Sequence, residues 1–383
     1  MNYLIIGAGG TGGCLGARLQ IAGQDVTWIA RGRHLAKMKE SGLIFRTGDQ
    51  GDICLNPVKA YTMEEYEASL ITQESRLTQE SRTVQESRTV QESRLTQKSR
   101  PIHGLPVPDV VFVCVKYYSL QESIPFLQRI CGAHTVVIPL LNVFGTGGEL
   151  QESLPDHDVL DGCIYIYGKI EEPGIVAQPS PIFRVYYGYR PGQTRREEAV
   201  LAQVEQDLKK AGIEGHFTET IQADALMKFS YVSPVGAAGL YYQALAEDFK
   251  KPGVQQDFLK ELIREVEALG EAMGIHFSED PVDRNLEILR GLDDKADTSM
   301  QRDVAAGKES EFQGLVYRVV ELADQYKVAC PAYRKVCRWA QEQAEKAAKA
   351  GKTEETAKAD GIEQAAGADG TEQAEKTGET GIS

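Results

Sequence analysis

The stretch that decides the fold lies at the N-terminus, where residues 3–19 read YLIIGAGGTGGCLGARL. Its first four residues are apolar and predict a strand, and residues 11–22 predict the helix that follows. Between the two lies the pattern Gly7-x-Gly9-x-x-Gly12. Glycines at this spacing between a strand and a helix are typical of a dinucleotide-binding turn, whereas an ordinary glycine-rich turn would lack these flanking elements.

Each glycine of this turn has its own expected role. Gly7 permits the tight turn, Gly9 lets the backbone approach a pyrophosphate, and Gly12 lets the helix pack closely on the strand. The free N–H groups and the dipole at the helix N-terminus favour the bound anion. The predicted cofactor-binding residues of the turn are Gly7, Ala8, Gly9, Gly10, Thr11 and Gly12.

The end of the second strand predicts which dinucleotide binds. Residues 25–34 read DVTWIARGRH, and the strand is expected over residues 25–30. An NAD site usually has Asp or Glu at this strand end for the ribose 2′-hydroxyl, and this segment has no acid there. Arg31, with Arg33 close by, can instead pair with a 2′-phosphate, which favours NADPH. Two solvated surface arginines are the alternative interpretation.

Strand and helix patterns alternate through the first 217 residues. Two continuous apolar runs, residues 109–115 and 135–140, predict strands covered on both faces. From residue 218 the pattern is almost wholly helical. The predicted fold class is therefore α/β, with a Rossmann-type doubly wound sheet in residues 1–217 and an all-helical domain in residues 218–340. Further strands are expected over residues 163–167 and 182–187, and helices over residues 195–211, 256–273 and 309–326.

Two segments fall outside this pattern. Residues 71–100 form a polar repeat of period six, ITQESR-LTQESR-TVQESR-TVQESR-LTQKSR, which we interpret as an exposed loop inserted in the first domain. Residues 341–383 contain mostly Ala, Glu, Lys, Gly and Thr and cannot bury enough apolar surface to fold alone. We expect a disordered polar tail there, whose start can extend the last helix.

Composition narrows the classes of function. The net charge of −14 argues against a nucleic-acid partner, because phosphate binding requires a basic surface. No apolar run approaches the ~20 residues of a membrane helix, and the chain opens on a strand rather than a signal peptide, so a cytoplasmic location is expected. The seven cysteines form no CxxC pair and have no histidine at zinc-ligand spacing, which indicates reduced thiols and no metal site.

Lys228 is the candidate proton donor. A carbonyl reductase needs a group that protonates the developing alkoxide, and none of the six histidines has an obvious catalytic context. Lys228 begins the second domain's helical run and is flanked by Met227 and Phe229, whose desolvation of the amine would lower its pKa. Without further evidence, a surface lysine on a helix is the commoner interpretation.

Five segments in a matching order resemble the ketopantoate reductase (2-dehydropantoate 2-reductase) family. The resemblance covers nearly all of residues 1–335 outside the repeat. Each motif is short, but five in order are specific. They are IIGAGGTGG at residues 5–13, VCVKYY at 113–118, LLNVFGT at 140–146, IQADALMKF at 221–229 and TSMQRDVAAGKESEF at 298–312.

The resemblance implies an NADPH-dependent reduction of ketopantoate to pantoate, a step of pantothenate biosynthesis. It makes Lys228 the general acid at the 2-oxo oxygen and Glu311 the carboxylate that sets the charge and position of this lysine. Ser299 would bind polar groups of the substrate, such as its carboxylate. Lys116 and Asn142 would lie by the nicotinamide ribose and the reacting centre, so that Asn142 contacts both cofactor and substrate.

The chain departs from the family pattern at three places. The family commonly has Gly after the loop asparagine, where this chain has Val143. It commonly has Asn four residues after the lysine, where this chain has Val232, and Ser233 beside it is the candidate substrate contact. It also has an Asn–Gly pair soon after the glutamate, where this chain has Val316–Tyr317.

These departures leave three functions open. The first is ketopantoate reduction, and the second is the reduction of another small 2-oxo acid by a paralogous enzyme. The third is a non-catalytic NADP-binding regulatory protein, which the repeat and the polar tail would suit. The expected partner is a small-molecule 2-oxo acid, with no membrane and no nucleic acid. The oligomeric state stays open, a homodimer being one alternative.

Overall fold

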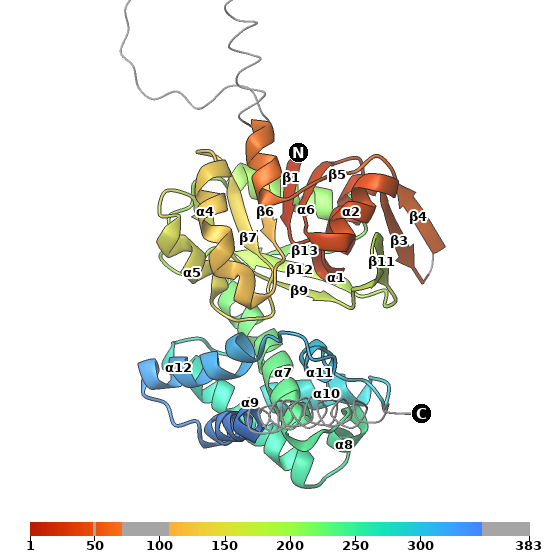
Figure 1. Cartoon of the computed structure of the whole chain (residues 1–383). Coiled ribbons are helices and arrows are strands. Elements are labelled where there is room, and N and C mark those ends of the chain that lie inside the picture. The colour runs from red at the N-terminus through yellow and green to blue at the C-terminus, as the bar shows by residue number, and fades with distance from the viewer. Residues whose placement is uncertain (49–50, 71–106, 347–383) are drawn as a thin grey trace, which may run out of the picture.

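The computed structural model describes residues 1–48, 51–70 and 107–346 (Figure 1). The predicted repeat loop at 71–100 therefore lies outside the described residues, as does the tail after residue 346. Figure 1 shows an α/β part above and a helical part below, which confirms the predicted fold class. None of the helices in the described ranges has the length and apolar character that crossing a membrane requires.

The main sheet has six strands in the order β5-β2-β1-β6-β7-β8, and every neighbouring pair is parallel. All residues of β6 and β7 are buried, as their continuous apolar sequences predict. The strands are β1 (Asn2–Ile6), β2 (Asp25–Ile29), β5 (Lys59–Tyr61), β6 (Val110–Val113), β7 (Val136–Pro139) and β8 (Asp158–Val159). The helices of this unit are α1 (Gly10–Ile21), α2 (Gly32–Ser41), α4 (Leu120–Ile130) and α5 (Thr146–Ser153), with a further helix at residues 63–70.

Two smaller sheets complete the α/β part. One has the order β10-β11-β3-β4 and packs through β11 on α1, which thereby lies between two sheets. The other has the order β13-β12-β9, and α6 (Glu198–Lys210) packs on β13. Only β9 and β12 of these strands were predicted. The strands are β3 (Leu43–Thr47), β4 (Gly51–Leu55), β9 (Asp161–Ile166), β10 (Lys169–Glu172), β11 (Ile175–Gln178), β12 (Phe183–Gly188) and β13 (Glu214–Phe217).

The long helix α7 (Ile221–Tyr242) joins the two parts. It contacts β9 and β12 of the α/β part and packs on α9 in the helical part (Figure 1). The change from strands to helices falls between β13 and α7. The remaining helices are α8 (Ala246–Lys250), α9 (Val254–Ala272), α10 (Pro281–Arg290), α11 (Ser299–Ala305) and α12 (Arg318–Tyr326).

One prediction about the helical part needs correction. The helix expected over residues 309–326 is interrupted, because residues 313–317 form a π-helical turn, η2 (Gln313–Tyr317), ahead of α12. Such turns are frequent at functional sites. The last helix runs over residues 331–346, so residues 341–346 extend it, as the sequence analysis allows for the start of the tail. The Ala, Glu and Lys residues of this segment favour that helix.

The close packing of α1 predicts the effect of a single methyl group. A Cβ at Gly16 would lie 2.6 Å from Cε2 of Trp28, whose side chain is fully buried. We expect Gly16→Ala to lower the free energy of unfolding by about 1–3 kcal/mol, because neither the helix nor the indole has room to move. Urea denaturation followed by circular dichroism measures the change.

Gly148→Ala is the matched control. Gly148 is also helical, and a Cβ there would have no atom within 4 Å. The free energy of unfolding should stay the same or rise by up to ~1 kcal/mol, since Ala is the better helix former. An equal loss of stability in both variants would contradict the packing described for α1.

Candidate active site

Four parallel strands bring the predicted site residues to one edge of the main sheet. Gly7 follows β1, Arg31 follows β2, Lys116 follows β6 and Asn142 follows β7. The chain moves from β1 to β2 on one side and returns to β6 on the other side of β1. In open parallel sheets, ligands bind at the carboxyl ends of the strands where the order reverses in this way.

The surroundings of the glycine turn match the roles that the sequence predicts for it. Gly7 has a φ of 99°, and a Cβ there would lie 2.8 Å from the carbonyl oxygen of Cys114. A Cβ at Gly12 would meet the carbonyl of Gly7 and lie 2.8 Å from Cγ2 of Ile5. At Gly9, the N-cap of α1, a Cβ would meet nothing within 4 Å. The space that a pyrophosphate would need is therefore open at Gly9 and closed at the two packing glycines.

Arg31 lies at the N-cap of α2, two residues after the end of β2. Its side chain is exposed, as is that of Arg33, and the first turn of α2 has no acidic residue. An exposed guanidinium at this strand end, with no ion pair among the described residues, has the charge and geometry that pair with the 2′-phosphate of NADPH.

Lys116 connects the sheet edge to the helical part. Its Nζ lies 2.9 Å from Oε2 of Glu311 and 3.3 Å from Oδ2 of Asp303. Oε1 of Glu311 accepts a hydrogen bond from the backbone N–H of Tyr117, and the Glu311 side chain is 3% exposed. Burial favours a lower pKa for Lys116, but the charges of Glu311 and Asp303 outweigh it and raise this pKa.

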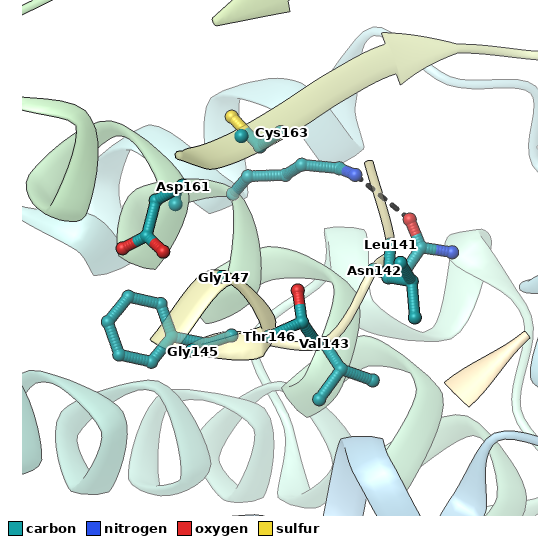
Figure 2. A pocket seen from close by; sticks show the side chains of 12 residues that line it. Leu141, Asn142, Val143, Gly145, Thr146, Gly147, Asp161 and Cys163 are labelled. Carbon is teal, nitrogen blue, oxygen red and sulfur yellow. Dashed lines mark hydrogen bonds between the residues drawn. The ribbon is translucent and has the colours of Figure 1, made fainter. Parts of the chain in front are cut away.

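Lys228 lies on α7 with its side chain buried. Its Nζ donates a hydrogen bond of 2.9 Å to Oδ1 of Asn142 (Figure 2). Nζ also lies 5.9 Å from the ring centroid of Tyr165 on β9. Burial lowers the pKa of the amine, while Cys163 and Glu311 favour its charged form. The desolvation that the sequence predicts for this lysine is thus present.

A small pocket opens beside this amine. Figure 2 shows the loop after β7 on one side and Asp161 and Cys163 at the start of β9 on another. Lys228 and Asn142 offer polar groups to the pocket, and Leu141, Val143 and Phe144 give it apolar walls. The lining residues are Leu141, Asn142, Val143, Phe144, Gly145, Thr146, Gly147, Asp161, Gly162, Cys163, Ala225 and Lys228.

Glu311 lies within the site, whereas Ser233 lies in the helical core. Glu311 makes its hydrogen bonds with Lys116 and Tyr117, and it acts on Lys228 only through its charge. Ser233 is fully buried, and its hydroxyl is bonded to the carbonyl of Leu315 and the hydroxyl of Tyr333. The hydroxyl of Ser233 is therefore bonded within the helical core and does not face the pocket, contrary to the predicted substrate contact.

Ser299 remains available to a ligand. It is the first residue of α11, is partly exposed, and follows the N-cap Thr298, whose hydroxyl accepts from the N–H of Gln301 at 3.2 Å. Asp303, the partner of Lys116, lies four residues later on the same helix and therefore shares a helix face with Ser299. The sequence interpretation missed Asp303, although it lies in the TSMQRD segment. It also missed Tyr165, whose strand carries no motif.

Two family models match this chain, and together they cover both of its parts. "Ketopantoate reductase PanE/ApbA" matches residues 3–192, and "Ketopantoate reductase PanE/ApbA C terminal" matches residues 220–344. The chain belongs to the ketopantoate reductase family. It is accordingly an oxidoreductase acting on CH–OH groups, and NADPH is the cofactor of the family.

Individual relatives of the family are distant in sequence. The 2-dehydropantoate 2-reductase of Mesorhizobium japonicum is 24% identical over 84% of this chain and 91% of its own length. The uncharacterized oxidoreductase YkpB of Bacillus subtilis is 22% identical over 88% of this chain and 96% of its own.

Solved structures share the fold. The 2-dehydropantoate 2-reductase from Methylococcus capsulatus superposes with a TM-score of 0.70 at 20% identity, covering 90% of this chain and 97% of its own. A D-mandelate dehydrogenase in complex with NADH and anilino(oxo)acetate gives 0.70 at 16% identity, covering 90% and 99%.

Because Gly9 borders open space, a substitution there should affect cofactor binding in this ketopantoate reductase family member without affecting its stability. We expect Gly9→Ala to weaken NADPH binding about tenfold or more, because the added methyl would occupy the space of the pyrophosphate. The midpoint of thermal unfolding without cofactor should stay the same, since this methyl meets no protein atom. Calorimetric titration with NADPH and a thermal scan provide the two readings, and unchanged NADPH affinity would contradict the assignment of the turn.

Proposed function

We propose that this chain reduces a 2-oxo acid to the 2-hydroxy acid with NADPH, with ketopantoate as the first candidate substrate and pantoate as its product. The reaction would then serve pantothenate biosynthesis. The observation that carries the proposal is the buried Lys228 amine, which Asn142 holds beside a pocket at the carboxyl edge of the nucleotide-binding sheet. A buried amine with a lowered pKa, next to a pocket, suits proton donation near neutral pH.

Lys228 would act at the 2-oxo oxygen of the substrate. Its ammonium stabilises the negative charge that develops on this oxygen and then transfers a proton to it, leaving a neutral amine that regains a proton from solvent. NADPH, when bound, supplies the hydride for the carbonyl carbon. The hydrogen bond to Asn142 keeps the amine at the pocket between turnovers.

The other residues of the site have supporting roles in this proposal. Glu311 holds Lys116 by an ion pair and, through its charge, favours the protonated form of Lys228. Lys116 and Asn142 would face the nicotinamide ribose from the ends of β6 and β7. The hydroxyl of Ser299, which has no hydrogen bond within the described residues, would bind the carboxylate of the substrate.

Val143 motivates a second candidate, the reduction of another small 2-oxo acid by the same chemistry. Its side chain is buried in the pocket wall and packs on Gly314, where a Cβ would lie 2.5 Å from Cγ2 of Val143. The pocket wall thus carries the isopropyl group of Val143, where the family commonly has a glycine. The absence of a side chain at Gly314 leaves the space that this group occupies. A panel of branched 2-oxo acids with NADPH separates the two candidates by their kcat/KM values.

A non-catalytic NADP-binding regulator is the remaining alternative. Such a protein would have no chemical need for a buried amine beside the pocket, because burying a charged group lowers stability. NADPH binding without turnover on any 2-oxo acid would favour it.

Removal of the Lys228 amine tests the proposed general acid. In Lys228→Ala, kcat should fall by about 10²- to 10⁴-fold, and the Kd for NADPH should change little. Lys260→Ala, at a lysine on α9 that pairs with Asp257 and does not line this pocket, is the control and should keep wild-type kcat. A Lys228→Ala enzyme with wild-type kcat would exclude the proposed role.

The pH dependence of kcat/KM is a second test of Lys228 as the general acid. Activity requires the protonated amine, so kcat/KM should fall as the pH rises through the pKa of Lys228. Because burial lowers this pKa, the fall should lie below the value near 10.4 of an ordinary lysine. The fall should be absent from the residual activity of Lys228→Ala.

Arg31 should decide between the two nicotinamide cofactors. We expect Arg31→Ala to raise the KM for NADPH about 10- to 100-fold, because the 2′-phosphate loses a charge-assisted hydrogen bond. The KM for NADH should stay nearly the same. Arg33 is a neighbouring exposed arginine. The change of the KM for NADPH in Arg33→Ala therefore measures the effect of losing any positive charge in this region. An equal change for both cofactors in Arg31→Ala would contradict the assignment.

A further inference from the structure

The amine of Lys228 faces an aromatic ring and not a carboxylate. Its hydrogen bond goes to the neutral amide of Asn142, and the ring centroid of Tyr165 lies 5.9 Å from Nζ. Glu311, the carboxylate that influences its charge, is bonded to Lys116 instead. A buried ammonium is costly without compensation, so the contribution of the ring matters here.

An aromatic row holds this ring in place. Tyr165 on β9 makes an edge contact with Tyr186 on β12, at 5.9 Å between centroids and an interplanar angle of 75°. Tyr186 in turn stacks on His216 of β13, at 4.7 Å and 24°. The three residues lie on three adjacent strands of one sheet, and α7 packs on the first two of these strands. The Tyr165 ring is therefore fixed by its packing.

We propose that Tyr165 is a positioning residue, whose ring stabilises the protonated form of Lys228 and keeps its ammonium at the pocket. The proposal rests on the proposed function of Lys228 as proton donor. A carboxylate in this place would clamp the ammonium and hold the proton more tightly. A ring face attracts the cation more weakly and accepts no proton, so the amine stays charged and still free to donate.

The other titratable groups around Lys228 are the same in every variant of Tyr165. Cys163 on β9 is neutral near pH 7, because burial raises the pKa of its thiol to about 12. Asp224 lies one turn earlier on α7, where its carboxylate accepts from the hydroxyls of Thr218 and Thr220. Glu311, paired with Lys116, lies before η2, and α10 contributes Arg284 near Tyr165. A change of the Lys228 pKa on replacing Tyr165 therefore reports on the ring.

The test compares Tyr165→Leu with Tyr165→Phe in the full-length enzyme. Leu keeps an apolar side chain but removes the ring, whereas Phe keeps the ring and removes a hydroxyl that makes no hydrogen bond within the described residues. The pKa of Lys228 is read by NMR titration of protein labelled with ¹³C at the lysine Cε, and the Lys228→Met spectrum identifies the signal. We expect Tyr165→Leu to lower this pKa by about one unit and Tyr165→Phe to leave it within a few tenths.

The kinetic profile should follow the titration. In Tyr165→Leu the fall of kcat/KM at high pH should move to lower pH by the same amount as the Lys228 pKa. In Tyr165→Phe this fall should stay at the wild-type pH. Tyr326→Leu, at an exposed tyrosine that ends α12, is the control for replacement of a tyrosine and should leave both readings unchanged. Tyr165→Met is the second ring-free variant, for use if Tyr165→Leu does not fold.

An unchanged Lys228 pKa in a folded ring-free variant would overturn the proposal, and so would an equal shift in Tyr165→Phe. Failure of the proposed function has a different signature. In that case the wild-type enzyme would turn over no 2-oxo acid, while the NMR titration would still show whether the ring acts on the amine.

Discussion

The amine of Lys228 donates a hydrogen bond across 2.9 Å to the side-chain oxygen of Asn142, and this contact joins α7 to the loop after β7. Removing an ammonium from water is unfavourable, and a single neutral hydrogen bond compensates for it only in part. The lowered pKa of Lys228 is the consequence. The position of this amine follows from the way α7 is anchored, since the same helix packs on the sheet of β9 and β12 and on α9 of the helical part.

The second contact between the two parts places opposite charges close together. Lys116 pairs with Glu311 and Asp303. The hydroxyl of the next residue, Tyr117, donates a hydrogen bond to Oε1 of Glu149. The same carboxylate oxygen lies 3.6 Å from Nη2 of Arg318. These pairs fix how the edge of the main sheet faces α11, η2 and α12. The π-helical turn η2 begins two residues after Glu311, and Gly314 within it lets Val143 and Tyr117 approach closely. The carboxyl ends of β6 and β7 and the helical part are thereby held in one arrangement.

The sequence was most informative where structure depends on local order along the chain. The β1–turn–α1 unit could be predicted because three glycines carry distinct steric requirements, and β6 and β7 because buried parallel strands are apolar throughout. The sheet of β3, β4, β10 and β11 could not, since a strand such as β10 is exposed along its whole length and has no apolar periodicity.

Contacts between residues distant in sequence are the part of the candidate site that could not be predicted from the sequence. Glu311 is 195 residues from Lys116, and only the fold decides that it pairs with this lysine and not with Lys228. Likewise, the burial of Ser233 depends on which face of α7 meets Leu315 and Tyr333. Helical spacing alone could not distinguish a core serine from a substrate contact.

The most direct test of this account is a crystal structure of the dead-end complex with NADP⁺ and a 2-oxo acid, a pair that cannot exchange a hydride. The account predicts the Nζ of Lys228 within about 3.2 Å of the 2-oxo oxygen, inside hydrogen-bonding distance. A 2-oxo oxygen held by other groups, with Lys228 bonded to Asn142 alone and directed away from the ligand, would contradict it.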